Sequence, residues 1–459
     1  MYFQKWETGG QNVNTGQKMN KRTDKEFKDY LETYSGSFCG AKWYNATVWL
    51  GSGMTTSCHH PLPHKIDIDA VQKNPKLLHN TPEKKEQRRQ MKCGERPQGC
   101  EYCWKIEDMG KEYISDRVYK SNIYTDEELE AAYNTPTEED VDLRTLEIAF
   151  DRTCNFACSY CNPAFSSTWV KDLKQHGGYE NLISDGRNHF THTHDEAQLY
   201  KFGETNPYVE AFFKWWDSDL HRTLRELRIT GGEPIMAGEL WRLFDWFKEN
   251  VDKSQTKLAI NSNLGGKADL IKRMCSAREW LPSLDVYTSA EATGARQDYI
   301  RDGMDSELWW NNLCMLHESN IDTHCMMTVN ALCLSTLPDL IDRILEQRKA
   351  YGTMDFAVFS LNILRFPSFQ SCLVLPAHIK RECIERLAEI DLSQCHQFEQ
   401  GQVTRLIEYL QSVEVPHSES FEMPKLHNDF KNFFAQYDKR RGKNFQETFP
   451  ELADWYNNL

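Results

Sequence analysis

The chain has 459 residues, 40% of them hydrophobic and 27% charged, which is typical of a globular protein with room for two or three domains. Its formal net charge of −14 disfavours a broad nucleic-acid surface, because phosphate backbones attract basic proteins. Neither a run of roughly 20 apolar residues nor a signal-peptide pattern occurs, so we expect a cytoplasmic protein with no membrane partner. Its fifteen cysteines then lie in a reducing compartment, where thiols serve as metal ligands rather than as disulfides.

The N-terminal third begins with a polar segment and continues into a cysteine-bearing hairpin. Residues 1–35 end in a helix predicted over 24–34, and we treat them as an N-terminal extension. After Cys39, the alternation of apolar and polar residues predicts a hairpin over 46–58 with a glycine-rich turn. The return strand of this hairpin ends in Cys58.

A second cysteine pattern follows, with a CxxC knuckle that comes directly after Gly99. A hairpin ending in a cysteine, combined with such a knuckle, is one way in which a small domain builds a four-thiolate site. We therefore assign 36–135 to an auxiliary iron–sulfur domain, in which Cys93 is a spare thiol that could replace one ligand. Structural zinc is the less favoured alternative, since thiolates suit both metals. The predicted ligands of an auxiliary [4Fe–4S] cluster are Cys39, Cys58, Cys100 and Cys103.

The most informative stretch is a short apolar run, 146–150, that leads into a loop with the spacing CxxxCxxC. The loop cysteines are Cys154, Cys158 and Cys161, and a helical pattern follows them. Three thiolates in so short a loop can hold three irons of a cubane cluster, and no fourth ligand comes soon after. The fourth iron is then open, which favours chemistry over a purely structural role. A zinc site or cysteines packed in a core are the alternatives.

From residue 146 onward, predicted strands alternate with helical patterns, which predicts an α/β fold with a parallel sheet. We expect a partial (β/α)6 TIM-like barrel over 140–400, with its active site at the carboxyl ends of the strands. Polar residues 125–142 lead into it as a linker or bridging helix. Residues 401–459 form a C-terminal helical tail, whose aromatic part from 425 docks onto the barrel. The predicted strands are 146–150, 226–230, 257–261, 284–288, 323–329 and 355–361, and the predicted helices include 237–251, 306–319 and 338–350.

One connection, residues 177–208, is polar and longer than a βα unit requires. It contains His189, His192 and His194 beside acidic residues, a group that could hold a metal. Because a fourth fixed ligand is missing, we favour a surface loop that covers the mouth of the barrel.

The second predicted strand of the barrel ends in Gly231-Gly232-Glu233-Pro234. Paired glycines let the backbone approach a ligand closely and expose its amides and carbonyls. At this position the segment resembles the motif with which the radical S-adenosylmethionine (SAM) superfamily binds the methionyl amino group of SAM. The CxxxCxxC loop, with Tyr160 just before its third cysteine, resembles the cluster loop of the same superfamily.

This resemblance implies further contacts with SAM at the ends of later strands. The polar segment after the third strand would reach the ribose or the methionyl carboxylate, and a glutamate after the fourth strand would reach a ribose hydroxyl. An asparagine after the fifth strand is similarly placed, and the tyrosine of the cluster loop would lie near the adenine. In order, these residues are Asn261, Ser262, Asn263, Glu291, Asn330 and Tyr160.

The element from Cys39 through Gly53 to Cys58 resembles the opening of the auxiliary-cluster motif in SPASM and twitch domains, although here it precedes the barrel. Across 38–459 the chain resembles twitch-domain-containing radical SAM proteins. This resemblance implies two [4Fe–4S] clusters and SAM as cofactors, and an electron donor such as flavodoxin or ferredoxin. One electron would split SAM into methionine and a 5′-deoxyadenosyl radical, which takes a hydrogen atom from a substrate. The four-thiolate cluster would serve electron transfer.

Three hypotheses about function remain open. The first is oxidation, cross-linking or maturation of a peptide or protein side chain, by analogy with proteins that carry such domains. The second is the same radical chemistry on a nucleoside, sugar or amino acid, and the third is a non-catalytic iron–sulfur or zinc scaffold. A winged-helix peptide-recognition segment is missing, and the sequence nominates no catalytic acid or base.

We expect core packing for the other cysteines, Cys275, Cys314, Cys325, Cys333, Cys372, Cys383 and Cys395.

Overall fold

The computed structural model of the chain describes residues 22–183, 188–201, 203–415 and 422–459. It shows a mixed α/β protein, in agreement with the predicted class. Among the described residues, no helix is both long and apolar enough to cross a bilayer.

The described residues fall into two compact units, each of which is assembled from several stretches of the chain. The first is called unit 1 and the second unit 2. Among the described residues, unit 1 comprises 22–151, 199–201, 203–229 and 250–258, and unit 2 comprises 152–183, 188–198, 230–249, 259–415 and 422–459.

Nine strands form one sheet, and all six strands predicted from residue 146 onward are present. The last of them begins at Val358 rather than at Asp355, because Ala357 has a φ of 48°, in the left-handed region that strands exclude. The strands are β1 (Asn45–Trp49), β2 (Met54–Thr56), β3 (His64–Lys65), β4 (Thr145–Ala149), β5 (Glu226–Thr230), β6 (Lys257–Asn261), β7 (Leu284–Thr288), β8 (Asp322–Val329) and β9 (Val358–Ile363). Their order in the sheet is β3-β2-β1-β4-β5-β6-β7-β8-β9.

The predicted hairpin is confirmed as β1 and β2, which pair antiparallel with Trp49 opposite Met54. Its turn requires glycine at Gly53, where φ is +64° and an added Cβ would lie 2.3 Å from the ring of Tyr208. The hairpin continues the sheet, because β1 also pairs parallel with β4. At the other end of the sheet, β7, β8 and β9 are parallel neighbours.

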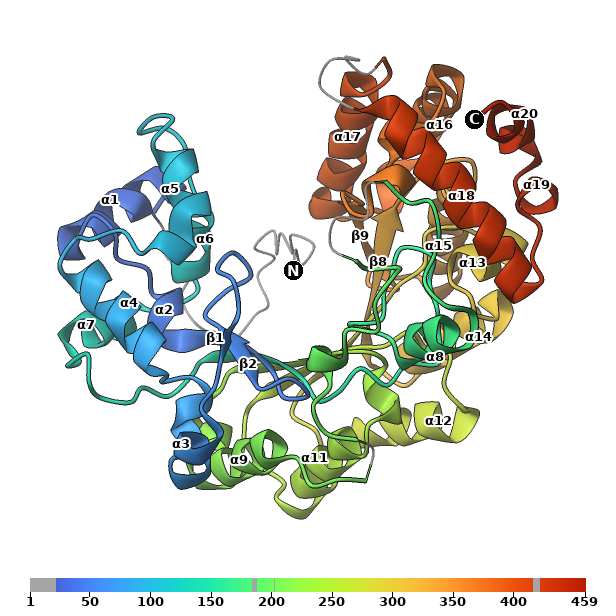
Figure 1. Cartoon of the computed structure of the whole chain (residues 1–459). Coiled ribbons are helices and arrows are strands. Elements are labelled where there is room, and N and C mark those ends of the chain that lie inside the picture. The colour runs from blue at the N-terminus through green and yellow to red at the C-terminus, as the bar shows by residue number, and fades with distance from the viewer. Residues whose placement is uncertain (1–21, 184–187, 202, 416–421) are drawn as a thin grey trace. The chain divides into compact units, whose positions relative to one another are not determined.

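Unit 1 surrounds its cysteines with short helices, of which α1 and α6 lie side by side (Figure 1). Its apolar core includes Phe27, Phe38 and Trp43 together with Cys39, Cys100 and Cys103. Leu129 is also in this core, so residues 126–134 are a packed helix rather than a polar linker. The helices of unit 1 are α1 (Asp24–Tyr34), α2 (Ala41–Tyr44), α3 (Ile68–Lys73), α4 (Pro82–Lys92), α5 (Glu101–Glu107), α6 (Asp116–Ser121), α7 (Asp126–Asn134), α9 (Pro207–Trp215) and α10 (His221–Thr223).

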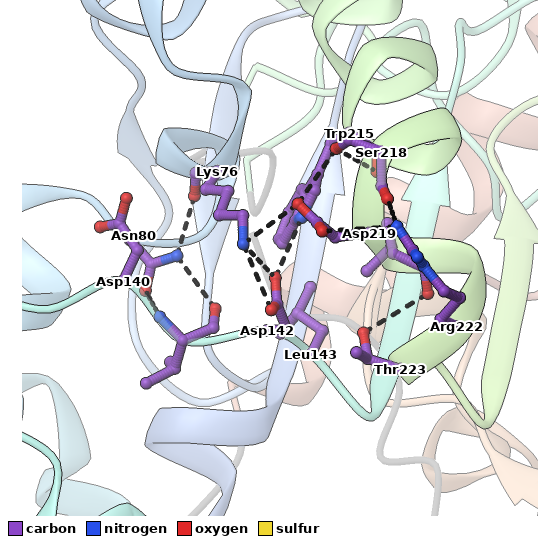
Figure 2. A network of polar contacts seen from close by, with 12 residues as sticks. Lys76, Asn80, Asp140, Asp142, Leu143, Trp215, Ser218, Asp219, Arg222 and Thr223 are labelled. Atoms are coloured by element: carbon purple, nitrogen blue, oxygen red, sulfur yellow. Dashed lines mark hydrogen bonds and ion pairs between the residues drawn. The ribbon is translucent and has the colours of Figure 1, made fainter.

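A polar network in unit 1 holds the segment that leads into β4 (Figure 2). The Nζ of Lys76 lies 3.0 Å from a carboxylate oxygen of Asp142 and 3.2 Å from one of Asp219. Trp215 donates its indole N–H to Asp142 as well, at 3.3 Å. Asp142 therefore fixes the chain just before β4, the strand that precedes the CxxxCxxC loop.

Unit 2 supplies the helices that follow the later strands, and α16 and α17 lie side by side in it (Figure 1). The helices predicted over 237–251, 306–319 and 338–350 are confirmed with ends shifted by one or two residues. The helices of unit 2 are α8 (Ser167–His176), α11 (Gly238–Glu249), α12 (Ala268–Ala277), α13 (Gly294–Ile300), α14 (Ser306–Glu318), α15 (Leu337–Tyr351), α16 (Ala377–Glu389), α17 (Gln397–Ser412), α18 (Met423–Arg441), α19 (Phe445–Thr448) and α20 (Ala453–Asn457).

The aromatic part of the tail packs within unit 2, against the loop of residues 177–208. Phe433 of α18 is fully buried and packs on Tyr179, with ring centroids 4.8 Å apart, and on Phe190 at the same distance. These two partners belong to the loop that was predicted to lie on the surface, so the loop has a buried side beneath α18. Its His192 is exposed, as a surface loop requires.

The cysteines outside the two predicted sites divide into two groups. Cys275 and Cys314 are only half-buried on the helices α12 and α14, so core packing is wrong for these two. The remaining five are buried as expected: Cys325, Cys333, Cys372, Cys383 and Cys395.

Candidate active site

The CxxxCxxC loop follows β4 and is held by the start of α8. The backbone N–H of Cys154 donates to Ser167 Oγ at 3.0 Å, and Thr168 Oγ1 donates back to the Cys154 carbonyl at 2.6 Å. Trp169 donates its indole N–H to the Cys158 carbonyl at 3.0 Å. These residues form the first turn of α8, so the helix that follows the loop also fixes the positions of its cysteines.

All three loop thiols are half-buried, and they interact with one another. Burial raises the pKa of Cys158 to about 11 and that of Cys161 to about 12, and the neighbouring Cys158 thiol raises the latter further. Burial, followed by Cys158, also raises the pKa of Cys154. Because thiolates are the form that binds metal, a metal or cluster entering this loop must displace protons.

Nitrogen donors surround the sulfur atoms of this loop. The backbone N–H of Phe156 lies 3.4 Å from Cys154 Sγ, and Asn263 Nδ2 lies 3.9 Å from the same sulfur. Arg301 Nη1 lies 3.9 Å from Cys158 Sγ. Donors and a cation at these positions stabilise negative charge on sulfur, so the loop fits thiolate ligands of a metal cluster.

The Gly231-Gly232-Glu233-Pro234 segment lies directly against the start of the cysteine loop. The backbone N–H of Glu233 donates to the Thr153 carbonyl at 2.7 Å. At Gly232, an added Cβ would lie 2.3 Å from the same carbonyl oxygen, a distance that only a glycine avoids. The residue before it, Gly231, has a φ of +123°. The ends of β4 and β5 therefore bring the two motifs together.

The side chain of Glu233 has a structural role that the sequence did not indicate. Its carboxylate is buried and accepts the Ser262 hydroxyl at 2.8 Å and the backbone N–H of Asn263 at 2.5 Å. Burial raises the pKa of Glu233 to about 7. Asn263 also donates to Asn155 Oδ1 at 2.8 Å, so the segment after β6 is tied both to Glu233 and to the cysteine loop.

The raised pKa of Glu233 predicts a pH-dependent stability for the protein without cofactors. Between pH 4.5, its ordinary value, and about 7, the folded chain keeps a proton that the unfolded chain has lost. The contribution of Glu233 to folding therefore falls as the pH rises through this window, by about 3 kcal/mol at most. Glu233→Gln removes this titration, so we expect its thermal midpoint to rise relative to wild type from pH 5 to pH 7.5. Exposed Glu249→Gln is the control, and a Glu233→Gln curve parallel to wild type would contradict the account.

Glu291 and Tyr160, both predicted to contact SAM, lie in one buried network. The Glu291 carboxylate forms an ion pair with Arg301 at 2.9 Å and accepts the Tyr160 hydroxyl at 2.9 Å. The Arg301 guanidinium also lies 5.5 Å from the centre of the Tyr160 ring. Arg301 therefore links Glu291 to Cys158, and no periodicity or motif in the sequence indicated this arginine.

The remaining predicted contacts of SAM lie at strand ends. Asn261 is half-buried at the end of β6. Asn330, after β8, is fully buried and donates to the Thr328 carbonyl at 2.8 Å while it accepts the Leu332 N–H at 2.9 Å. Both side-chain hydrogen bonds of Asn330 are local, as in a strand-end cap.

In unit 1, the four cysteines of the predicted auxiliary site line a single pocket with Lys42, His60 and Asp116. Cys58 lies at the end of the hairpin, whereas Cys100 and Cys103 lie at the start of α5. Burial raises the pKa of Cys39 to about 11, and the neighbouring thiols of Cys58 and then Cys100 raise it further. Cys93 does not line this pocket; it is exposed at the end of α4, 3.8 Å from Arg89. The cysteines of the pocket are Cys39, Cys58, Cys100 and Cys103.

A buried lysine with a neutral hydrogen-bond partner, Lys42, lines this thiol pocket. Lys42 is 2% exposed and donates to Gln87 Oε1 at 2.6 Å, and its charge opposes the rise in pKa that burial gives Cys100. Lys84 does not line the pocket; it is fully buried and donates to Thr55 Oγ1 at 2.8 Å, and burial lowers its pKa far below the usual range, which favours its neutral amine. Buried charges are costly unless they are compensated. The pocket is therefore suited to an anionic occupant, such as a cluster held by four thiolates.

Comparisons with known proteins found limited similarity. No family model matches the chain, and a search of curated proteins found no match. Among solved structures, native anSMEcpe with bound AdoMet is 12% identical, with a TM-score of 0.32 over 53% of this chain and 59% of that chain. Native anSMEcpe with bound AdoMet and Cp18Cys peptide is 12% identical, with a TM-score of 0.30 over 69% of this chain and 99% of that chain. The first match thus spans less than two thirds of the neighbour's length, and similarity this low does not place the chain in a family.

Proposed function

We propose that the protein is a radical SAM enzyme with a [4Fe–4S] cluster on Cys154, Cys158 and Cys161. The observation that carries the proposal is the backbone contact between the cluster loop and the glycine motif. The N–H of Glu233 bonds to the Thr153 carbonyl, which leaves no room for a side chain at position 232. A loop with three thiols and a backbone shaped for close approach to a ligand therefore lie side by side.

The surroundings of the three thiols support this assignment. Their partial exposure leaves room for a small molecule at the cluster, and the donors near Cys154 and Cys158 would offset the charge of thiolates. We further propose that β4 to β9 and their helices form the partial barrel, with domains at 1–35, 36–135, 140–400 and 401–459. Parallel strands with their site at the carboxyl ends are the arrangement that such a barrel requires.

When bound, the cluster and SAM supply reductive cleavage of the sulfonium and abstraction of a hydrogen atom from a substrate carbon. The chain's own residues bind SAM and position it beside the cluster. Gly231 and Gly232 offer backbone groups to the methionyl end of SAM, and Asn263 orients its amide toward the Cys154 sulfur. Arg301 keeps Cys158 in a positive field while it holds Glu291 and Tyr160 in place.

The substrate that we propose is a peptide or protein side chain, which is oxidised, cross-linked or matured. The support for this class is the resemblance of the motifs to those of twitch-domain radical SAM proteins. A small molecule such as a nucleoside, sugar or amino acid is the second candidate. The two are separated by adding a peptide library or a metabolite pool to the reduced enzyme and following the deuterium that deuterated substrates transfer to 5′-deoxyadenosine.

The proposed activity is tested by the cleavage of SAM itself. The protein is reconstituted anaerobically with iron and sulfide, reduced with dithionite, and supplied with SAM. We expect 5′-deoxyadenosine, measured by liquid chromatography, to accumulate above a control without protein. If none forms in protein that carries iron and sulfide, the chain is a non-catalytic scaffold.

We also propose an auxiliary [4Fe–4S] cluster in the thiol pocket of unit 1. Four thiolates would leave no iron open, which suits electron transfer, and the neighbouring Lys42 favours an anionic occupant rather than neutral thiols. Zinc is the alternative occupant.

Metal analysis of the reconstituted protein distinguishes the two occupants. We expect about eight irons per chain in wild type and about four in the double variant Cys100→Ala/Cys103→Ala. Cys93→Ala is the matched control, since this thiol is exposed outside the pocket, and it should keep about eight. About four irons and about one zinc in wild type, with the zinc lost in Cys100→Ala/Cys103→Ala, would instead identify a zinc site in the pocket.

A further inference from the structure

Beside the thiol pocket, two histidines and an aspartate converge on one point. His60 Nε2 lies 2.7 Å from Asp116 Oδ2, and His59 Nε2 lies 3.2 Å from the same oxygen. Of the residues that the structure describes, these three form the only set of histidine, cysteine or acidic side chains whose possible ligand atoms all lie within 4.8 Å of one another. Each side chain is partly buried, between 9% and 20% exposed.

Separate elements hold these side chains in place. The histidines directly follow Cys58, at the end of the hairpin, and Asp116 is the first residue of α6. The His60 ring stacks on Tyr102 of α5, with centroids 3.9 Å apart and an interplanar angle of 15°. The imidazole is thus fixed with its Nε2 toward Asp116. Such prior positioning reduces the conformational entropy that binding an ion would cost.

The donor set is that of a transition-metal site. Two imidazole nitrogens and one carboxylate oxygen are ligands that zinc and iron(II) share, and three protein ligands leave coordination positions open. Without an ion, Asp116 Oδ2 hydrogen bonds to both imidazoles, so the three donor atoms already converge. An ion placed between them would use all three donors at once.

We propose that His59, His60 and Asp116 bind one divalent transition-metal ion. This site is separate from the cluster ligands, although His60 and Asp116 also line the thiol pocket. The inference does not depend on the proposed function, because it needs only the three side chains. A metal next to the thiol pocket would fix the end of the hairpin, and with it Cys58.

The experiment uses the full chain, reconstituted with iron and sulfide, treated with a chelator and then dialysed against increasing Zn²⁺. Zinc and iron are counted by mass spectrometry. We expect wild type to bind about one zinc per chain in addition to its iron. Asp116→Asn and His60→Asn should weaken zinc binding by about a hundredfold or more, since loss of an outer-shell partner alone costs about 10- to 100-fold.

Two controls make the outcomes distinct. His64→Gln alters a nearby half-buried histidine that bonds to Thr81, and it should bind zinc as wild type does. Cys100→Ala/Cys103→Ala should also retain the zinc, whether or not the pocket holds a cluster. Equal zinc binding by wild type and Asp116→Asn would overturn the proposal. So would a loss of iron together with zinc in His60→Asn, because that histidine would then belong to the cluster pocket.

Discussion

Replacing Cys158 with alanine is expected to remove about four irons per chain and to reduce 5′-deoxyadenosine formation to the background without enzyme. Two thiolates cannot retain a cubane cluster that already leaves one iron open. Arg301 keeps its ion pair with Glu291 in the variant, so the fold of unit 2 should survive. Iron, sulfide and 5′-deoxyadenosine are measured on the same anaerobic preparation.

The control for this variant is Cys275→Ala on α12. That thiol is also half-buried, but its sulfur contacts the carbonyl of Met315 and not the cluster loop. The Cys275→Ala variant should keep both its iron and its SAM-cleavage activity. Wild-type 5′-deoxyadenosine formation in Cys158→Ala would mean that the CxxxCxxC loop does not hold the reactive cluster.

Gly232→Ala is expected to lower the rate of SAM cleavage by about a hundredfold or more while leaving the iron content unchanged. The new Cβ would lie 2.3 Å from the carbonyl oxygen of Thr153 and 2.7 Å from backbone atoms of Arg152. Because these obstacles are backbone, the loop or the motif must shift, and a displacement of about 1 Å can cost a hundredfold in rate. Because Ser167 and Thr168 of α8 also hold Cys154, we expect the glycine motif to take up most of the shift, so that the three thiols can still bind the cluster.

Gly238→Ala is the matched control for this substitution. Gly238 begins α11, a few residues downstream of Gly232, and an added Cβ there meets open space. The rate of SAM cleavage by Gly238→Ala should stay within about twofold of wild type, because the added methyl group contacts no residue of the site. If Gly232→Ala were as active as Gly238→Ala, the close approach of the two motifs would have no role in SAM cleavage.

Local patterns in the sequence predicted most of the strands and the meeting of the two motifs. The apolar run before Cys154 and the run before Gly231 each indicate a strand, and parallel strands in one sheet bring their carboxyl ends to the same edge. The motifs therefore had to lie near each other, as the bond from Glu233 to Thr153 shows. The aromatic spacing of α18 likewise indicated its buried face, because that spacing is a property of the helix alone.

Contacts between distant segments left no such signal. Arg301 lies 143 residues from Cys158 in sequence, and Asn263 lies 109 residues from Cys154. Such pairs depend on how the elements pack, which periodicity does not encode. The same holds for Asp116, which meets His60 across 56 residues. The sequence did not indicate the role of the Glu233 carboxylate for another reason. The motif indicated a backbone role, whereas the side chain accepts a hydrogen bond from Ser262, just after the neighbouring strand β6.

The central claim is that SAM binds to the cluster held by Cys154, Cys158 and Cys161, and electron paramagnetic resonance tests it most directly. The Cys100→Ala/Cys103→Ala variant is reduced with dithionite, so that only this cluster contributes to the spectrum, which is recorded with and without SAM. We predict that SAM changes the g values of the reduced cluster, because its amino and carboxylate groups bind the open iron. A spectrum that SAM leaves unchanged, in protein that carries about four irons per chain, would contradict the account.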